Sequence, residues 1–133
     1  MDTTSETFSE DSSLDSLNII PGYVESTSPT KFKSYFTRNI GGPNFFGGFR
    51  NAVPSFKSSR PKARVHHAPG DKLTGHHAFR GFIGPHTLRF NLDNGAYIDG
   101  VLDKPLNKRI DVSGRGEWVW VLPADGDIIS DDV

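Results

Sequence analysis

The chain has 133 residues and no cysteine, so one domain is expected and neither a disulfide framework nor a thiolate zinc site can form. Hydrophobic residues make up 35 % of the chain and the net charge is −1. No segment approaches the roughly 20 apolar residues that cross a bilayer, and the first residues lack the basic and apolar features of a signal peptide. We therefore expect a cytoplasmic protein, of a cell or a virion, without a membrane span and not secreted through a signal peptide.

Residues 1–27 are expected to form a disordered acidic tail. Six Asp and Glu occur among the first 25 residues, where Lys and Arg are absent and Ser and Thr are frequent. Such a composition buries too little apolar surface to offset the entropy of ordering the chain. Residues 28–123 then form a single compact β-rich domain with a basic, aromatic N-terminal half, and residues 124–133 form a second acidic tail. No internal repeat is visible beyond the recurring hairpin pattern.

A short helix is expected at residues 29–40. Ser28 can cap its first turn and Pro29 suits the first helical position. Apolar side chains then follow at helical spacing: Phe32, Tyr35, Phe36 and Ile40. Residues 44–53 are expected to be a short helix or a loop anchored by aromatic side chains, because two adjacent glycines weaken a helix. An edge strand is expected at residues 62–67.

The rest of the domain shows the period-two alternation of antiparallel strands. Strands are expected at residues 77–83, 87–92, 96–102, 108–113 and 117–122. Asn94-Gly95 predicts a type I′ hairpin turn between the second and third of these, and Gly114-Arg115-Gly116 predicts a turn between the last two. The fold class is α+β or mainly β: a small antiparallel meander of at least four strands, as a sheet or small barrel, with one short N-terminal helix.

The stretch from Ser26 to Gly70 has no acidic residue but eight basic ones, and seven aromatic side chains lie between Lys31 and Arg64. Lys and Arg neutralise phosphates, and flat side chains stack with bases. A simpler interpretation places the aromatic side chains in the core and the cations on a solvated face. The candidate residues for binding nucleic acid or another anion are Lys31, Lys33, Arg38, Arg50, Arg60, Lys62, Arg64 and Arg115.

All five histidines lie within the 21 residues from His66 to His86. Histidine binds transition metals through a neutral ring nitrogen and serves as an acid or base near neutral pH. Adjacent strand residues face opposite sides, so each histidine pair can offer one member to a site. A metal site would use His67, His77 and His86. Because no known ligand spacing is matched, surface histidines are the simpler interpretation, and no cofactor is predicted.

Two enzymatic interpretations use the same histidines. His66-His67 followed by the segment Asn91 to Gly95 resembles part of the motif of the His-Asn-His nucleases, which implies a water-activating histidine and a later metal-holding histidine. No histidine follows Asn91, so that last ligand is missing. A metal-free ribonuclease would need an acid, a base and a cation to steady the phosphorane, for which the candidates are His67, His77, and Lys72 or Arg80.

The favoured interpretation is a non-enzymatic binding or accessory protein whose basic aromatic segment contacts an anionic partner, with RNA or DNA favoured and the acidic tails modulating the contact. Charged tails on a compact β body are typical of many viral and phage accessory proteins. Two alternatives remain: a histidine-dependent nuclease, and a protein interaction module that uses the aromatic segment and the N-terminal tail. Trp118 and Trp120, on one strand face, are expected in the core or as a stacking platform.

Overall fold

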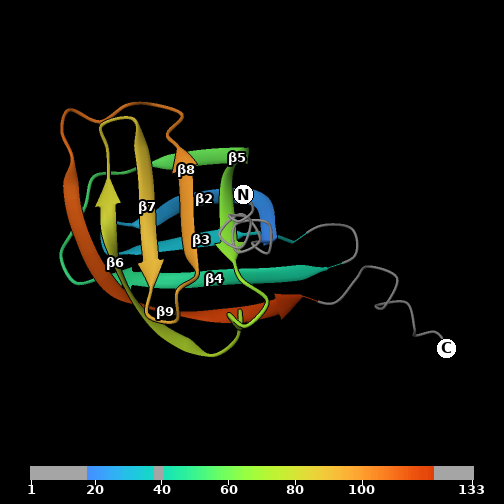
Figure 1. Ribbon diagram of the computed structural model, residues 1–133. Coiled ribbons are helices and arrows are strands. Elements are labelled where there is room, and N and C mark those ends of the chain that lie inside the picture. Colours follow the sequence, from blue (N-terminus) through green and yellow to red (C-terminus); the bar gives the residue numbers. More distant parts are fainter. Residues whose placement is uncertain (1–17, 38–40, 122–133) are drawn as a thin grey trace, which may run out of the picture.

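The computed structural model describes residues 18–37 and 41–121, which form a closed antiparallel β-barrel of eight strands (Figure 1). The strands are β2 (Asn18–Ser28), β3 (Lys31–Tyr35), β4 (Gly42–Phe49), β5 (Lys57–His67), β6 (His76–Ile83), β7 (Thr87–Leu92), β8 (Tyr97–Val101) and β9 (Ile110–Val121). The expected small antiparallel barrel is thereby confirmed. The part of the chain that the structure describes contains no helix that could cross a membrane.

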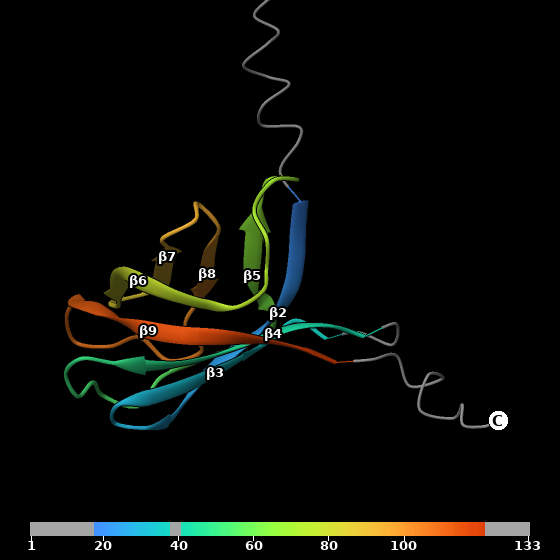
Figure 2. The same cartoon turned by 90° about the horizontal axis from the view of Figure 1, so that it is seen from below.

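The strand order around the barrel is β2-β3-β4-β9-β6-β7-β8-β5, with β5 pairing back to β2. Two three-stranded meanders, β2-β3-β4 and β6-β7-β8, lie on opposite sides of the barrel (Figure 2). β5 follows the first meander in the chain but pairs with the last strand of the second, and β9 pairs with the last strand of the first. The first half of the chain forms β2 to β5 and the second half forms β6 to β9. Each meander therefore pairs, at its last strand, with a strand from the other half of the chain.

The register repeats this two-fold pattern at the residue level. In both halves the last strand of the meander places an apolar side chain opposite an apolar side chain, and two residues further on a glycine opposite a small residue. The pairs are Phe45 with Trp118 and Gly47 with Gly116 in one interface, and Ile98 with Val65 and Gly100 with Ala63 in the other. The repeat that the sequence does not display is thus present in the pairing of the strands.

The helix expected at residues 29–40 is wrong, because this segment contains strand β3. Phe32, Ser34 and Phe36 are buried at every second position, which is the period of a strand. Residues spaced by four, such as Phe32 and Phe36, share a face in a strand as well as in a helix, so the spacing could not separate the two structures. Ser28 does not cap a helix; its Oγ accepts a hydrogen bond from the Thr30 N–H at 3.3 Å in the turn before β3.

Three further expectations are corrected at neighbouring segments. Residues 18–27, which were assigned to the acidic tail, form most of β2, where Val24 is fully buried between β3 and β5. Residues 44–53 are neither a short helix nor a loop up to Phe49, since β4 occupies them. Residues 62–67 lie in β5, which pairs on both sides and is not an edge strand. Residues 1–17 and 122–133, which hold the rest of the predicted tails, lie outside the described residues.

The turn expected at Gly114-Arg115-Gly116 is also wrong, because β9 continues through it as one strand of 12 residues. These glycines serve close packing. A Cβ at Gly116 would lie 2.4 Å from the Phe45 ring, and one at Gly114 would lie 1.8 Å from the Gly48 carbonyl oxygen. A glycine inside a strand often marks such a close approach.

The hairpin between β7 and β8 is confirmed, although its turn type differs from the prediction. A type I′ turn needs positive φ at both central residues, but Asn94 does not have it, while Gly95 has φ +102°. The Gly95 N–H donates to the Leu92 carbonyl at 3.1 Å and the Leu92 N–H donates to the Ala96 carbonyl at 2.9 Å. This pattern matches a three-residue loop with glycine at the left-handed position.

The interior of the barrel is filled by aromatic rings. Phe32, Phe45, Phe49, Phe79 and Phe90 are each at most 6 % exposed, and neighbouring rings among them have centroids 4.8–6.3 Å apart. An eight-stranded barrel has an interior just wide enough for side chains to fill. The inner face is therefore occupied by the core.

The packing at Gly116 gives a prediction for stability. Gly116→Ala places a methyl group against the buried Phe45 ring, and overpacking of this kind costs about 1–3 kcal/mol. Thermal unfolding should show a lower melting temperature than that of the wild type. Gly70→Ala is the control, because a Cβ there has no neighbour within 4 Å and should leave the melting temperature nearly unchanged. Equal melting temperatures for the two variants would contradict the close packing of β9 on the core.

Candidate anion-binding site

The aromatic side chains of the basic stretch are mostly structural. Five of the seven lie in the core, each no more than 6 % exposed: Phe32, Phe36, Phe45, Phe49 and Phe56. Tyr35 and Phe46 project from the outer face, where Phe46 is 37 % exposed. The simpler interpretation of the aromatic residues is therefore correct for most of them, and a binding surface made of the whole segment does not form.

Several cations of the stretch are already engaged by groups from elsewhere in the chain. Lys62 Nζ lies 2.5 Å from Asp103 Oδ1, and Arg64 Nε lies 3.7 Å from Asp99 Oδ1. Arg60 donates to two backbone carbonyls, those of Pro21 and Tyr35. Lys33 and Lys57 both lie within 3.6 Å of Glu25. Folding thus brings carboxylates to a stretch that has none in its own sequence.

Asp103 shows how firmly one of these cations is held. Its carboxylate accepts hydrogen bonds from the Lys62 ammonium and from the hydroxyl and the N–H of Ser59. Together these donors, with Lys62 the strongest, hold the pKa of Asp103 well below its ordinary value of 3.8. Lys62 is therefore a weak candidate for contact with an external anion.

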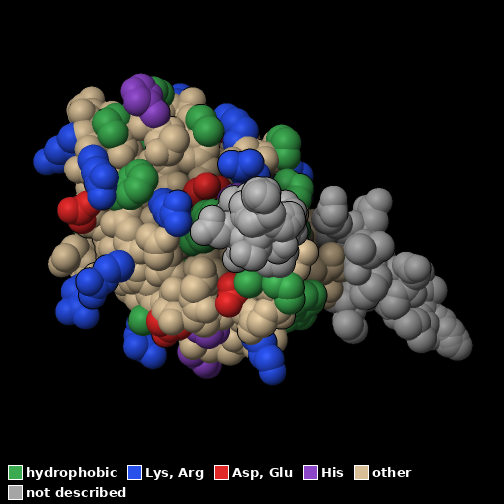
Figure 3. Space-filling model, viewed as in Figure 1, with side chains coloured by type: hydrophobic (Ala, Val, Ile, Leu, Met, Phe, Trp, Pro, Cys, Tyr) green, Lys and Arg blue, Asp and Glu red, His purple; other side chains and the backbone are tan. Residues whose placement is uncertain are grey.

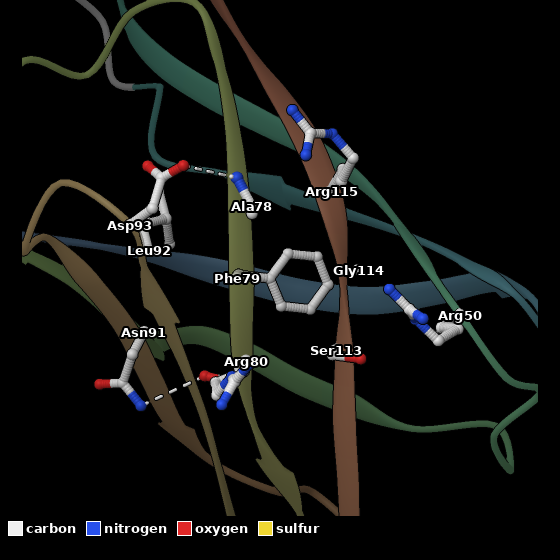
Figure 4. A pocket seen from close by; sticks show the side chains of 10 residues that line it. All are labelled: Arg50, Ala78, Phe79, Arg80, Asn91, Leu92, Asp93, Ser113, Gly114 and Arg115. Carbon is white, nitrogen blue, oxygen red and sulfur yellow. Dashed lines mark hydrogen bonds between the residues drawn. The ribbon is translucent and has the colours of Figure 1, made fainter.

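Three other arginines surround a shallow hollow of about 730 Å³ on the outer face, which we call the arginine hollow: Arg50, Arg80 and Arg115. Arg80 points outward from β6 and Arg115 from β9, while Arg50 follows β4 and is fixed by its N–H, which donates to the Ser113 carbonyl at 2.8 Å. Figure 4 shows Arg50 and Arg115 beside β9, with Arg80 at the lower edge. All three side chains are exposed, and none forms an ion pair with an acid among the residues that the structure describes.

The wall of the hollow on β7 is polar and ordered. The Asn91 amide donates to the Arg80 carbonyl at 3.3 Å and accepts a hydrogen bond from Arg89 Nε at 2.8 Å. The Arg89 guanidinium lies over the Tyr97 ring, 3.9 Å from its centroid. Asn91 therefore links Arg89 to the strand that carries Arg80. Arg89 is a fourth arginine beside the arginine hollow, and it too has no carboxylate partner in the described part of the chain.

One carboxylate, that of Asp93, lies at the rim of the arginine hollow. One oxygen lies 2.6 Å from His77 Nδ1, and the other accepts a hydrogen bond from the Ala78 N–H at 3.0 Å, which Figure 4 shows. The bond from His77 lowers the pKa of Asp93 most, followed by the bond from Ala78, and the charge of Arg115 adds to the effect. Asp93 is thus held mainly by its hydrogen bonds to His77 and Ala78 and forms no ion pair with the three arginines of the hollow.

The net charge of the whole barrel also favours contact with anions. Residues 18–37 and 41–121 carry 14 Lys and Arg against seven Asp and Glu, a net charge of +7, whereas residues 1–17 and 122–133 carry nine carboxylates and no Lys or Arg. Lys and Arg side chains are spread over the face that β6, β7 and β8 present, with few acidic side chains between them (Figure 3). A near-neutral chain therefore folds into a cationic barrel with acidic flanking segments.

The histidines make separate local contacts. His66 is stacked on Tyr97 and lies 2.9 Å from Asp99, His67 contacts the Ala68 carbonyl, and His76 lies 3.7 Å from Glu117. His86 lies in the β6–β7 turn, at the opposite end of the barrel from the other four. Within residues 18–37 and 41–121, no three side chains of the metal-ligating types come together, so His67, His77 and His86 do not form the metal set considered as an alternative.

His77 has no free nitrogen for acid–base work. Nδ1 faces the Asp93 carboxylate, and Nε2 lies 2.7 Å from the Thr74 carbonyl. Both ring nitrogens are therefore within hydrogen-bond distance of acceptor groups of the protein itself. Of the other residues proposed for a ribonuclease, Arg80 lines the arginine hollow and Lys72 lies in the exposed connection before β6.

The outcome differs among the remaining residues singled out by sequence. Arg50 and Arg115 are brought together at the arginine hollow, whereas Lys31 and Lys33 lie on β3 and Arg38 lies outside the described residues. Trp118 is 5 % exposed and part of the core, while Trp120 is 54 % exposed and donates from Nε1 to the Leu73 carbonyl. Sequence reasoning missed Arg89, named Asn91 only as part of a nuclease motif, and named Arg80 only for catalysis. The available signal was their place at outward positions of strands 77–83 and 87–92.

The contacts of Asp103 predict a pH dependence of stability. Because its pKa is lower in the folded protein than the ordinary 3.8, ionised Asp103 stabilises the fold above about pH 4, and this contribution is lost as the pH falls below that value. Asp103→Asn should unfold at a lower temperature at pH 7 and lose less stability than the wild type between about pH 5 and pH 2. Asp111→Asn, at a carboxylate 83 % exposed, controls for the change in charge. Parallel curves for Asp103→Asn and wild type would contradict the assignment.

Comparison with known proteins gives no relative from which a function could be transferred. No family model matches the chain. No curated protein and no solved structure matches it either.

Proposed function

We propose that this chain is a non-enzymatic binding protein whose barrel holds an anionic partner, with nucleic acid favoured, at the arginine hollow. The observation that supports this most directly is the set of three exposed guanidinium groups, on or next to three different strands, without carboxylate partners among the described residues. Surface arginines in a folded protein commonly pair with nearby acids, as Arg64 and Arg109 do here. The arginines of the hollow are left for an external anion.

The chemistry of the hollow favours phosphate. A guanidinium presents a planar fork of donors that matches two oxygens of a phosphate group. Arg80 and Arg115 project from paired strands, so the separation of their backbones is fixed before the ligand arrives. Each phosphate that is neutralised releases counterions, which makes several modest contacts on an exposed surface sufficient for binding.

The acidic flanking segments give the proposal a modulating element. Their nine carboxylates nearly balance the charge of the barrel, and they lie on the same chain at high effective concentration. They would compete with phosphates for the arginines and make binding weaker and more selective. Partners of high charge density, such as RNA or DNA, are the ones that can displace them.

The test replaces the three arginines together, as Arg50→Gln, Arg80→Gln and Arg115→Gln. Binding of a labelled oligonucleotide is measured by fluorescence anisotropy at salt concentrations from about 50 to 200 mM, where phosphate contacts respond most strongly. Each lost phosphate contact should reduce the slope of log affinity against log salt by about one, so the triple variant should lose about three units of slope and bind at least about tenfold more weakly at the lowest salt.

The matched control is Lys57→Gln, Lys104→Gln and Lys108→Gln, which makes the same change in net charge at exposed positions outside the arginine hollow. This control should retain most of the wild-type slope. If both triple variants weaken binding equally, the general charge of the barrel is responsible and the hollow is not a site. If the wild type binds no oligonucleotide at about 50 mM salt, the proposal of nucleic-acid binding is wrong.

A further inference from the structure

A second hollow on the outer face adjoins the arginine hollow and has a different chemistry. It encloses about 370 Å³ on β3 and β4 and is lined mainly by Lys31, Lys33, Phe46, Gly47 and Gly48. Phe46 is 37 % exposed, and its ring meets Tyr35 edge-on with centroids 5.7 Å apart. We call this surface the Phe46 hollow. It combines an exposed aromatic ring with the ammonium group of Lys31, while that of Lys33 is paired with Glu25.

The floor of the Phe46 hollow is kept bare by Gly48, one of its two glycines. A side chain at Gly47 would collide with the Phe32 ring inside the barrel, which accounts for that glycine. Gly48 has no such reason, because a Cβ there would have its nearest neighbour at 3.5 Å, an ordinary contact. The absence of a side chain at Gly48 leaves a flat strip of backbone beside Phe46, against which a planar group can lie.

The register connects the two hollows. Gly48 pairs with Lys31 on β3 and with Arg115 on β9, so these three residues form one row across adjacent strands. Neighbouring strands lie about 4.8 Å apart, which places Lys31 and Arg115 about 10 Å from each other across Gly48. A chain of phosphates can therefore follow Lys31 and Arg115 into the arginine hollow without meeting a side chain at Gly48.

The aromatic rings beside the arginine hollow are, by contrast, already covered. Tyr97 on β8 has the His66 ring stacked on it at 4.3 Å and the Arg89 guanidinium over it at 3.9 Å, and these come from the strands on its two sides. Phe82 on β6 is covered by Arg109 at 4.3 Å. Those rings cannot stack with a ligand unless the protein contacts open, whereas Phe46 offers an exposed ring at the border of the same basic surface.

We infer that the ligand of this surface is a single-stranded nucleic acid, with one base against Phe46 and its backbone phosphates running over Lys31 and Arg115 to the arginine hollow. This inference rests on the proposed function. A single strand exposes its bases for stacking on aromatic side chains, while a duplex keeps them inside. Glu117, which pairs with Phe46 in the register, disfavours phosphate on the far side of the ring and directs the backbone towards Arg115.

The test compares three ligands with equal numbers of phosphates per strand: an oligothymidylate, an oligomer of the same length made of abasic sugar-phosphate units, and a duplex. The wild type should bind the oligothymidylate about five- to 150-fold more tightly than the abasic oligomer, the range expected for stacking of one base. It should also prefer the oligothymidylate to the duplex. Fluorescence anisotropy at one fixed salt concentration measures all three affinities.

Phe46→Leu should remove the preference for bases and leave the affinity for the abasic oligomer unchanged, because the phosphate contacts remain. Phe46→Tyr keeps an aromatic face and should keep the preference. Phe82→Leu is the matched control, since it makes the same substitution on the outer face at a ring that Arg109 already covers, and it should behave as the wild type. Thermal unfolding of each variant checks that the barrel is intact.

The outcomes separate the two proposals. Equal affinity of the wild type for the oligothymidylate and the abasic oligomer would overturn base stacking while leaving phosphate binding at the arginine hollow intact. A preference for bases that persists in Phe46→Leu would place stacking elsewhere and would also overturn the inference. Failure of the wild type to bind any of the three ligands would instead contradict the proposed function itself.

Discussion

The structure depends on the packing of large aromatic rings inside a narrow barrel. Phe32 and Phe45 fit only because Gly47 and Gly116 place no side chain in their way. A large side chain on one strand thus lies opposite a glycine on another, and side chains fill the closed interior. The glycines that look like breaks in the sequence are what allow the strands to continue and the barrel to close.

This use of the interior determines where recognition can take place. Inward positions hold the core, and outward positions carry nearly all the charge, on strands that already saturate one another's backbone groups. On β5 the cations meet carboxylates from the β8 side of the barrel, whereas on β6 and β9 the arginines face small or neutral neighbours such as Ala78 and Ser113. Whether a cation is paired within the protein or remains without a carboxylate partner therefore depends on the residues of the strand that lies beside it.

The parts that sequence predicted well are those in which one short signal suffices. The alternation in residues 87–92 and the turn at Gly95 are local, and the corresponding hairpin is present. The segment around Phe32 was misread because its spacing suits a helix as well as a strand, and only the pairing with β2 and β4 decides between them. Likewise, nothing in the sequence indicated that Arg50 and Arg115 lie close together in the fold, and Arg89 was missed. Their proximity arises from the register of strands far apart in the chain, which no local pattern encodes.

The exchange of strands β5 and β9 between the two meanders has a consequence for how the chain can fold. Neither half can close by itself, because its meander lacks the partner that the other half supplies, so most of the stabilising contacts join distant residues and are expected to form together and slowly. Cleavage in the connection between β5 and β6 would yield two four-stranded fragments that complement each other. Shifting every strand by four positions reproduces the same circular order, so the two halves of the chain hold equivalent places in the barrel.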